Sequence, residues 1–118
     1  MKVLFLDDDP TRHAKFRQAH IGVDVNYVWT AKEAIEAMAE EYFEQMSLDH
    51  DLAAQLNMEL PPEGEGSGYD VALHIAQLPE DKRPKLVVIH SFNPEGARRM
   101  HIAINKAGIS CIKLPFNY

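Results

Sequence analysis

The chain has 118 residues, of which 46% are hydrophobic and 25% charged, and its formal net charge is −6 at pH 7. This length predicts one domain, spanning residues 1–118, with a core of its own. No apolar run approaches the ~18 residues of a membrane-spanning helix, and the first apolar run is too short for a signal peptide, so a cytoplasmic protein is expected. The one cysteine, Cys111, excludes an internal disulfide and a zinc site built from several cysteines.

The two signs of charge are segregated along the chain. Residues 33–81 contain thirteen acidic residues and no lysine or arginine, whereas residues 82–118 contain seven basic residues and one acid, Glu95. General binding of duplex DNA needs a broad basic face, so this distribution argues against it. The same distribution is compatible with a small anionic ligand that is held by a few basic side chains from residues 82–118. Most of these charges are expected to be ordinary solvated surface.

The first part of the chain alternates apolar runs with helix signals. Residues 2–6 form a nearly continuous apolar run, typical of a strand buried on both faces. A helix over 10–19 is predicted next, because Asp9 is a good cap and Pro10 suits a first helical turn. A second strand is predicted over 23–29, and Thr30 with Glu33 forms a capping box that opens a second helix. A third strand is predicted over 43–48.

The second part begins with an excursion over 52–68 that contains two prolines and three glycines. A connection this long inside a small domain usually has a function. A helix over 69–78, a strand over 85–89, a helix opened by Asn93 and Pro94, and a strand over 109–112 are predicted beyond it. The repeated alternation predicts an α/β fold, with a five-stranded parallel sheet and helices on both faces.

Polar side chains gather where the predicted strands end, which is where such sheets bind ligands. The residues concerned are Asp7, Asp8, Asp49, His50, Asp51, His90, Ser91 and Lys113. Carboxylates brought together from two strand ends repel one another unless a cation or a proton is present. Oxygen ligands favour a hard ion, so Asp7, Asp8 and Asp49 predict a site for Mg²⁺ or Mn²⁺. The alternative for Asp8 and Asp9 is that they only cap the first helix.

These residues resemble the signature of the receiver domain of response regulators. The resemblance implies a flavodoxin-like, three-layer sandwich in which Asp7 and Asp8 bind Mg²⁺ and Asp49 accepts a phosphoryl group. It also implies that Ser91 and Lys113 contact that group. The sequence departs from the pattern because Leu114 separates Lys113 from the following proline, the loop after Asp49 is longer, and a full fifth helix is expected to be lacking.

His50 and His90 are foreign to ordinary receivers, and they point to a narrower resemblance. The run LDHDL at 48–52, the run GYDVA at 68–72 and the run HSFNPEG at 90–96 are similar to motifs of the cyclic-phosphate-processing receiver domain. That resemblance implies hydrolysis or transfer at a cyclic phosphodiester.

Opening a cyclic phosphate needs a base that activates water and an acid that protonates the leaving oxygen. Two histidines can divide those roles, so His50 and His90 are the candidate catalytic pair, together with Asp49 and Asp51. The candidate phosphate-binding residues are Ser91, Asn93 and Lys113, because hydroxyls, amides at a helix start and a lysine all stabilise anionic oxygens.

Three functions therefore stay open. The first is a phosphoesterase acting on a cyclic nucleotide or an RNA end, the second is a stand-alone receiver phosphorylated on Asp49, and the third is a receiver-like binding protein without catalysis. The two histidines and the long loop favour the first.

A homodimer is also expected, because without a fifth helix one face of the last strand lacks cover. The apolar residues at 114–118 would cover that face or join a dimer contact.

Overall fold

The computed structural model describes residues 1–52 and 66–115. Its five parallel strands form one sheet in the order β2-β1-β3-β4-β5. The strands are β1 (Lys2–Leu6), β2 (Asp24–Val28), β3 (Gln45–Leu48), β4 (Leu86–Ile89) and β5 (Cys111–Lys113). The predicted α/β fold, with its five-stranded parallel sheet, is confirmed.

The helices are α1 (Pro10–Ala19), α2 (Ala31–Glu40), α3 (Gly68–Ala76) and α4 (Pro94–Lys106), with a short 3-10 helix, η1 (Glu80–Lys82). Three of them, α1, α2 and α4, begin where the capping residues predict. Asp9 accepts a hydrogen bond from the backbone N–H of Thr11 at the start of α1. Thr30 and Glu33 form the predicted capping box of α2. Asn93 caps α4 by accepting from the N–H of Gly96.

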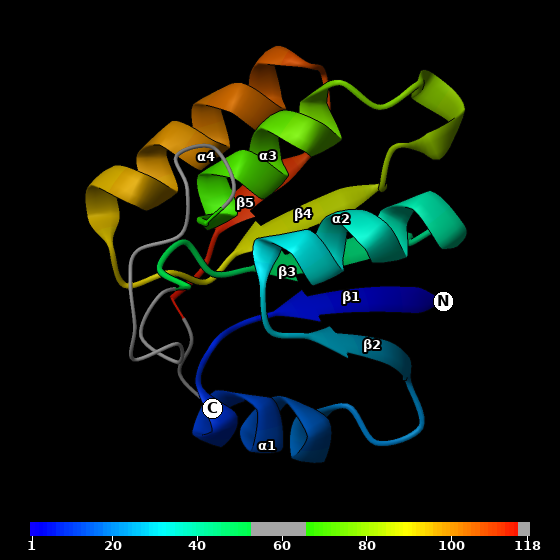
Figure 1. Ribbon diagram of the computed structural model, residues 1–118, viewed down its shortest axis with the longest axis vertical. Coiled ribbons are helices and arrows are strands. Elements are labelled where there is room, and N and C mark those ends of the chain that lie inside the picture. The colour runs from blue at the N-terminus through cyan, green and yellow to red at the C-terminus, as the bar shows by residue number, and fades with distance from the viewer. Residues whose placement is uncertain (53–65, 116–118) are drawn as a thin grey trace.

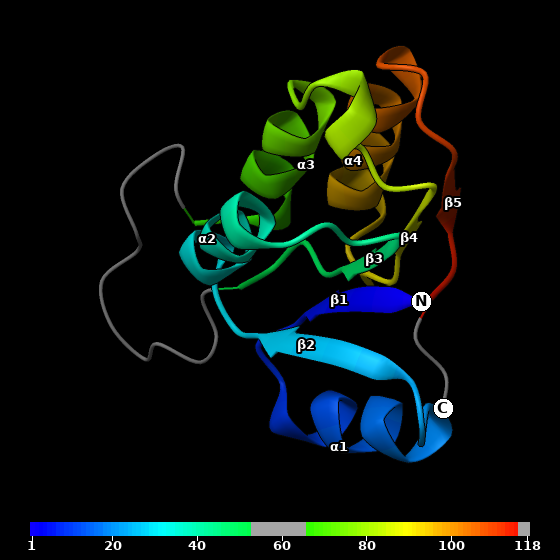
Figure 2. The same ribbon diagram turned by 90° about the vertical axis from the view of Figure 1, so that its right-hand side faces the viewer.

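Helices cover both faces of the sheet unequally. Helix α1 lies on one face, beside β1 and β2, and α2, α3 and α4 lie on the other (Figure 1 and Figure 2). The smaller core, on the α1 side, is formed by Val3, Phe5 and Phe16. The larger core joins the opposite face to α2, α3 and α4. In the described ranges, none of the helices has the length and apolar composition of a membrane-spanning segment.

The last strand is covered on one face only. Cys111 is buried in the larger core, whereas Ile112 is 46% exposed and Leu114 is also exposed. Because alternate residues of a strand point to opposite faces, Ile112 lies on the α1 side of the sheet. Within residues 1–52 and 66–115 no helix follows β5, as predicted. The predicted cover from residues 116–118, and most of the predicted excursion over 52–68, lie outside the described residues.

The predicted homodimer would use the exposed face of β5, so a charge placed there should disrupt it. Ile112→Glu is expected to give a monomer in light scattering, because a carboxylate cannot be buried unpaired in an apolar contact. The matched control is Ile102→Glu, since Ile102 is 45% exposed and belongs to α4, which lies on the opposite face of the sheet. It should leave the dimer intact. A wild-type mass that stays monomeric at every concentration would reject the dimer.

Candidate functional site

Three carboxylates meet at one edge of the sheet. Asp7 and Asp8 follow β1, Asp49 follows β3, and these two strands are neighbours with Leu6 paired to Leu48. One oxygen from each carboxylate lies within 4.8 Å of the others. The three residues, called the acidic cluster below, are 0%, 3% and 4% exposed. The predicted juxtaposition of Asp7, Asp8 and Asp49 is therefore present.

Asp7 and Asp49 of the acidic cluster have opposite pKa shifts. Burial and the neighbouring charge of Asp7 raise the pKa of Asp49 to about 7. Burial also acts to raise the pKa of Asp7, but hydrogen bonds from His90 and Arg12 outweigh it, and the pKa of Asp7 is lowered. Within the described part of the chain, the buried Oδ2 of Asp49 has no hydrogen-bond partner. A group of buried carboxylates with one such oxygen fits a divalent cation.

Arg12, on the first turn of α1, contacts every carboxylate of the acidic cluster. It binds Asp7 with two hydrogen bonds, from Nε to Oδ2 at 2.7 Å and from Nη2 to Oδ1 at 3.0 Å. Its Nη2 also lies 3.7 Å from Asp8 and 3.5 Å from Asp49. Arg12 was not among the site residues predicted from the sequence. The available signal was its position four residues after Asp8 at the start of a helix, a spacing at which an acidic and a basic side chain can pair.

His90 lies behind Asp7 in the interior of the sheet and is 2% exposed. Its Nε2 is 2.8 Å from Oδ2 of Asp7, and its Nδ1 is 2.8 Å from Oγ of Ser47. The ring stacks on Phe5, with the two centroids 5.1 Å apart. A neutral imidazole satisfies both polar contacts if the Ser47 hydroxyl donates to Nδ1 and Nε2–H donates to Asp7. Ser47, a polar residue in a buried strand, was also missed.

His50 lies on the other side of Asp49, half-buried against the start of α4. Its Nδ1 is 2.7 Å from Oδ1 of Asp51, and the side chain of Asn93 donates to the same oxygen at 3.2 Å. Burial acts to raise the pKa of Asp51, but these two partners outweigh it and the pKa is lowered. The backbone N–H of His50 donates to Oδ1 of Asp49 at 2.9 Å. His50 and Asp51 thus form a pair joined to the acidic cluster through Asp49.

Two glycines allow the chain to pass this closely around His50. A Cβ on Gly96 would lie 2.5 Å from the His50 ring. A Cβ on Gly68 would overlap the carbonyl oxygen of Asp49, and the Gly68 N–H donates to the His50 carbonyl at 2.9 Å. Both glycines belong to the motifs noted in the sequence, so those motifs are explained here by close approach of the backbone.

The three predicted phosphate-binding residues lie in different surroundings. Ser91 is buried, and its Oγ accepts from the backbone N–H of Asn93 at 3.0 Å. Asn93 caps α4 and contacts Asp51, so it borders the pair formed with His50. Lys113 is exposed at the end of β5, where its backbone pairs with β4, and its side chain makes no hydrogen bond or ion pair to the described residues. The structure therefore brings Asn93 to the site but shows no contact between Lys113 and the acidic cluster.

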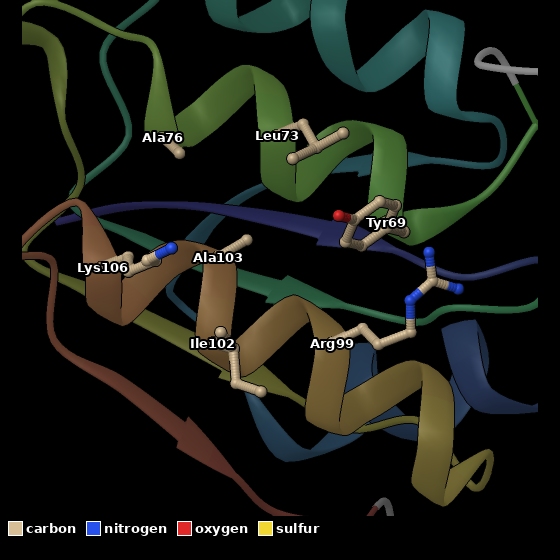
Figure 3. Close-up of a pocket in the computed structure, with 7 residues that line it drawn as sticks. All are labelled: Tyr69, Leu73, Ala76, Arg99, Ile102, Ala103 and Lys106. Atoms are coloured by element: carbon tan, nitrogen blue, oxygen red, sulfur yellow. The ribbon is translucent and has the colours of Figure 1, made fainter.

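A surface groove of about 350 Å³ lies between α3 and α4 (Figure 3). Its lining residues are Tyr69, Leu73, Ala76, Arg99, Ile102, Ala103 and Lys106. The guanidinium of Arg99 lies over the ring of Tyr69, 4.3 Å from its centroid. None of the predicted site residues lines this groove, so it is separate from the acidic cluster.

Solved structures of receiver domains share this fold. A response regulator receiver domain protein from Methanospirillum hungatei is 21% identical, with a TM-score of 0.65 over 98% of this chain and 82% of that chain. A receiver domain from Methylobacillus flagellatus is 17% identical, with a TM-score of 0.63 over 99% and 88% of the two chains. A response regulator from Burkholderia pseudomallei, which holds a phosphorylated aspartic acid, a calcium ion and citrate, is 20% identical. Its TM-score is 0.63 over 98% of this chain and 61% of that chain.

These similarities establish the receiver fold, and the family follows from the sequence itself. No curated protein matches the chain. Residues 2–106 match the family described as "Cyclic-phosphate processing Receiver domain". The matched range contains the acidic cluster, His50, Asp51, His90 and Asn93. The chain belongs to the family of cyclic-phosphate-processing receiver domains.

Proposed function

We propose that this protein is a cytoplasmic, metal-assisted phosphoesterase that opens a cyclic phosphate in a cyclic nucleotide or at an RNA end. The observation that carries the proposal is the pair formed by His50 and Asp51, 2.7 Å apart, beside the buried Asp49. An imidazole oriented by a carboxylate is suited to proton transfer. A protein that only receives a phosphoryl group on Asp49 needs neither residue.

The acidic cluster would hold the metal ion, which we propose to be Mg²⁺ or Mn²⁺. When bound, such an ion stabilises negative charge on phosphoryl oxygens and activates water. Asp7 is oriented for this by His90, whose Nε2 hydrogen bonds to its Oδ2. The buried place of His90, between Ser47 and Asp7, favours a positioning role for it over the proton transfer predicted from the sequence.

His50 would carry the proton transfer of ring opening. Asp51 holds Nδ1, which leaves Nε2 to accept a proton from the attacking water. The water oxygen forms a bond to phosphorus, one ring P–O bond breaks, and the released oxygen takes a proton from solvent. The N–H groups at the start of α4, with Ser91 and Asn93, would donate to the phosphate oxygens. Lys113 remains a candidate for this role from the sequence alone.

Phosphorylation of Asp49 is the second candidate function. The observation that favours it is Oδ2 of Asp49, which lies beside Asp7 and Asp8 without a hydrogen bond from the described residues. The phosphorylated aspartic acid in the Burkholderia pseudomallei response regulator supports the same chemistry. This candidate leaves the pair of His50 and Asp51 without a function.

A screen of cyclic nucleotides and of RNA ends carrying a cyclic phosphate tests the proposal. We expect turnover of at least one substrate with Mg²⁺ or Mn²⁺ and none with a chelator. Asp7→Asn should abolish both turnover and the thermal stabilisation by the metal ion, because Asp7 is the most buried carboxylate of the acidic cluster. The exposed Asp24 provides a control, and Asp24→Asn should change neither. Failure to open any cyclic phosphate would contradict the proposal.

A further inference from the structure

The guanidinium of Arg12 contacts the same three carboxylates that would hold a cation. Two of its nitrogens bind Asp7 at 2.7 and 3.0 Å, and Nη2 reaches Asp49 and Asp8 at 3.5 and 3.7 Å. The side chain of Arg12 is three-quarters buried there. The positive charge that compensates the acidic cluster in this structure is therefore a side chain of the protein itself, Arg12.

Arg12 also has two contacts outside the acidic cluster. Its Nη1 lies 3.2 Å from Oδ2 of Asp9, which is partly exposed. Its guanidinium carbon lies 5.8 Å from the ring centroid of the exposed Phe92, in the turn before α4. Asp9 and Phe92 can retain the guanidinium at the mouth of the site after it leaves the buried carboxylates.

We propose that Arg12 is a tethered counter-ion, which withdraws from the acidic cluster when a divalent cation binds there and then contacts the anionic ligand. Arg12 would thus make the phosphate contact that the sequence assigns to Lys113, which is exposed and has no ion pair to the described residues. The proposal rests on the proposed function only in taking that ligand to be a phosphate.

The physical reason is that a guanidinium and a divalent cation cannot share the same buried oxygens. Both need Asp7, Asp8 and Asp49, and their positive charges repel one another at this distance. A guanidinium freed at the mouth of the site is well suited to a phosphate, because its fork matches two phosphate oxygens. Binding of the metal ion and binding of phosphate should therefore strengthen one another, as thermodynamic linkage requires.

Titration calorimetry with Mg²⁺ alone tests the first half of the proposal. At about pH 8, where the carboxylates are ionised, Arg12→Gln is expected to lower the Kd for Mg²⁺ at least about tenfold, because the competing charge is gone. The matched control is Arg17→Gln, since Arg17 lies on the same helix and stacks on Tyr27, 4.1 Å from its ring centroid. Its Kd should equal that of wild type. A Kd for Arg12→Gln that equals or exceeds the wild-type value would overturn the proposal.

Inorganic phosphate tests the second half. Mg²⁺ should increase the affinity of wild type for phosphate, and Arg12→Gln should abolish that increase although it binds Mg²⁺ more tightly. Arg12→Lys keeps the charge without the fork, so its Kd for Mg²⁺ should lie between those of wild type and Arg12→Gln. It preserves the test if Arg12→Gln fails to fold. If Arg12→Gln does not both bind Mg²⁺ more tightly and lose the Mg²⁺-dependent gain in phosphate affinity, Arg12 is not a tethered counter-ion. Absence of cyclic-phosphate turnover would contradict the proposed function alone.

Discussion

Replacement of His50 by glutamine is expected to lower the rate of cyclic-phosphate opening by about a hundredfold or more, the usual contribution of a positioned proton-transfer group. Glutamine can keep a hydrogen bond to Asp51, so the backbone around Asp49 should retain its place. The affinity for Mg²⁺ should stay at the wild-type value, because the side chain of His50 is not part of the acidic cluster. Initial rates and calorimetry on the same preparation measure the two quantities.

Two other histidines serve as comparisons for this prediction. His74→Gln, on α3, should leave both the rate and the metal affinity unchanged. His90→Gln should lower the affinity for Mg²⁺ and the melting temperature as well as the rate, because His90 joins Asp7 to Ser47 in the interior. A wild-type rate in His50→Gln would remove His50 from the reaction.

Asp49→Asn is expected to stabilise the metal-free protein at about pH 8 by roughly 2–4 kcal/mol. The pKa of Asp49 is raised from 3.8 to about 7 in the folded protein. The folded state therefore keeps a proton that the unfolded chain has already lost. The stability linked to this proton is fully present below the unfolded pKa and is lost as the pH rises through about 7. Asparagine is neutral at every pH, so it escapes this loss.

Thermal unfolding in the presence of a chelator measures the effect. The melting temperature of Asp49→Asn should exceed that of wild type by about 5 °C or more near pH 8, and the difference should vanish near pH 4, where both side chains are neutral. Mg²⁺ should reduce this difference in melting temperature near pH 8, because the metal ion compensates the negative charge of Asp49, which only the wild type carries. A stability difference that does not change with pH would show that Asp49 ionises normally in the folded protein.

The fold was predictable because its determinants are local. The apolar runs define the strands, and Asp9, Thr30 and Asn93 define the starts of three helices by capping them. The acidic cluster was predictable for a topological reason, since parallel strands end at the same edge of the sheet. Asp7 and Asp49 therefore meet once β1 and β3 are neighbours.

The rest depends on where side chains point after the strand ends, and that is a tertiary property. His90 turns inward to Asp7 and Ser47, whereas His50 turns toward Asp51, and nothing in their local sequence distinguishes the two directions. Arg12 was overlooked because a basic residue on a helix start is most often solvated. Here it lies in the acidic cluster, where it contacts all three carboxylates.

Opening of a cyclic phosphate can be followed directly by phosphorus NMR of the protein with Mg²⁺ and the substrate selected by the screen. We expect the cyclic-phosphate signal to be replaced by a phosphomonoester signal in wild type, and to persist in His50→Gln and in the presence of a chelator. If the cyclic-phosphate signal persists in wild type, while acetyl phosphate under the same conditions forms a stable aspartyl phosphate on Asp49, the protein is a phosphoryl acceptor and not a cyclic phosphoesterase.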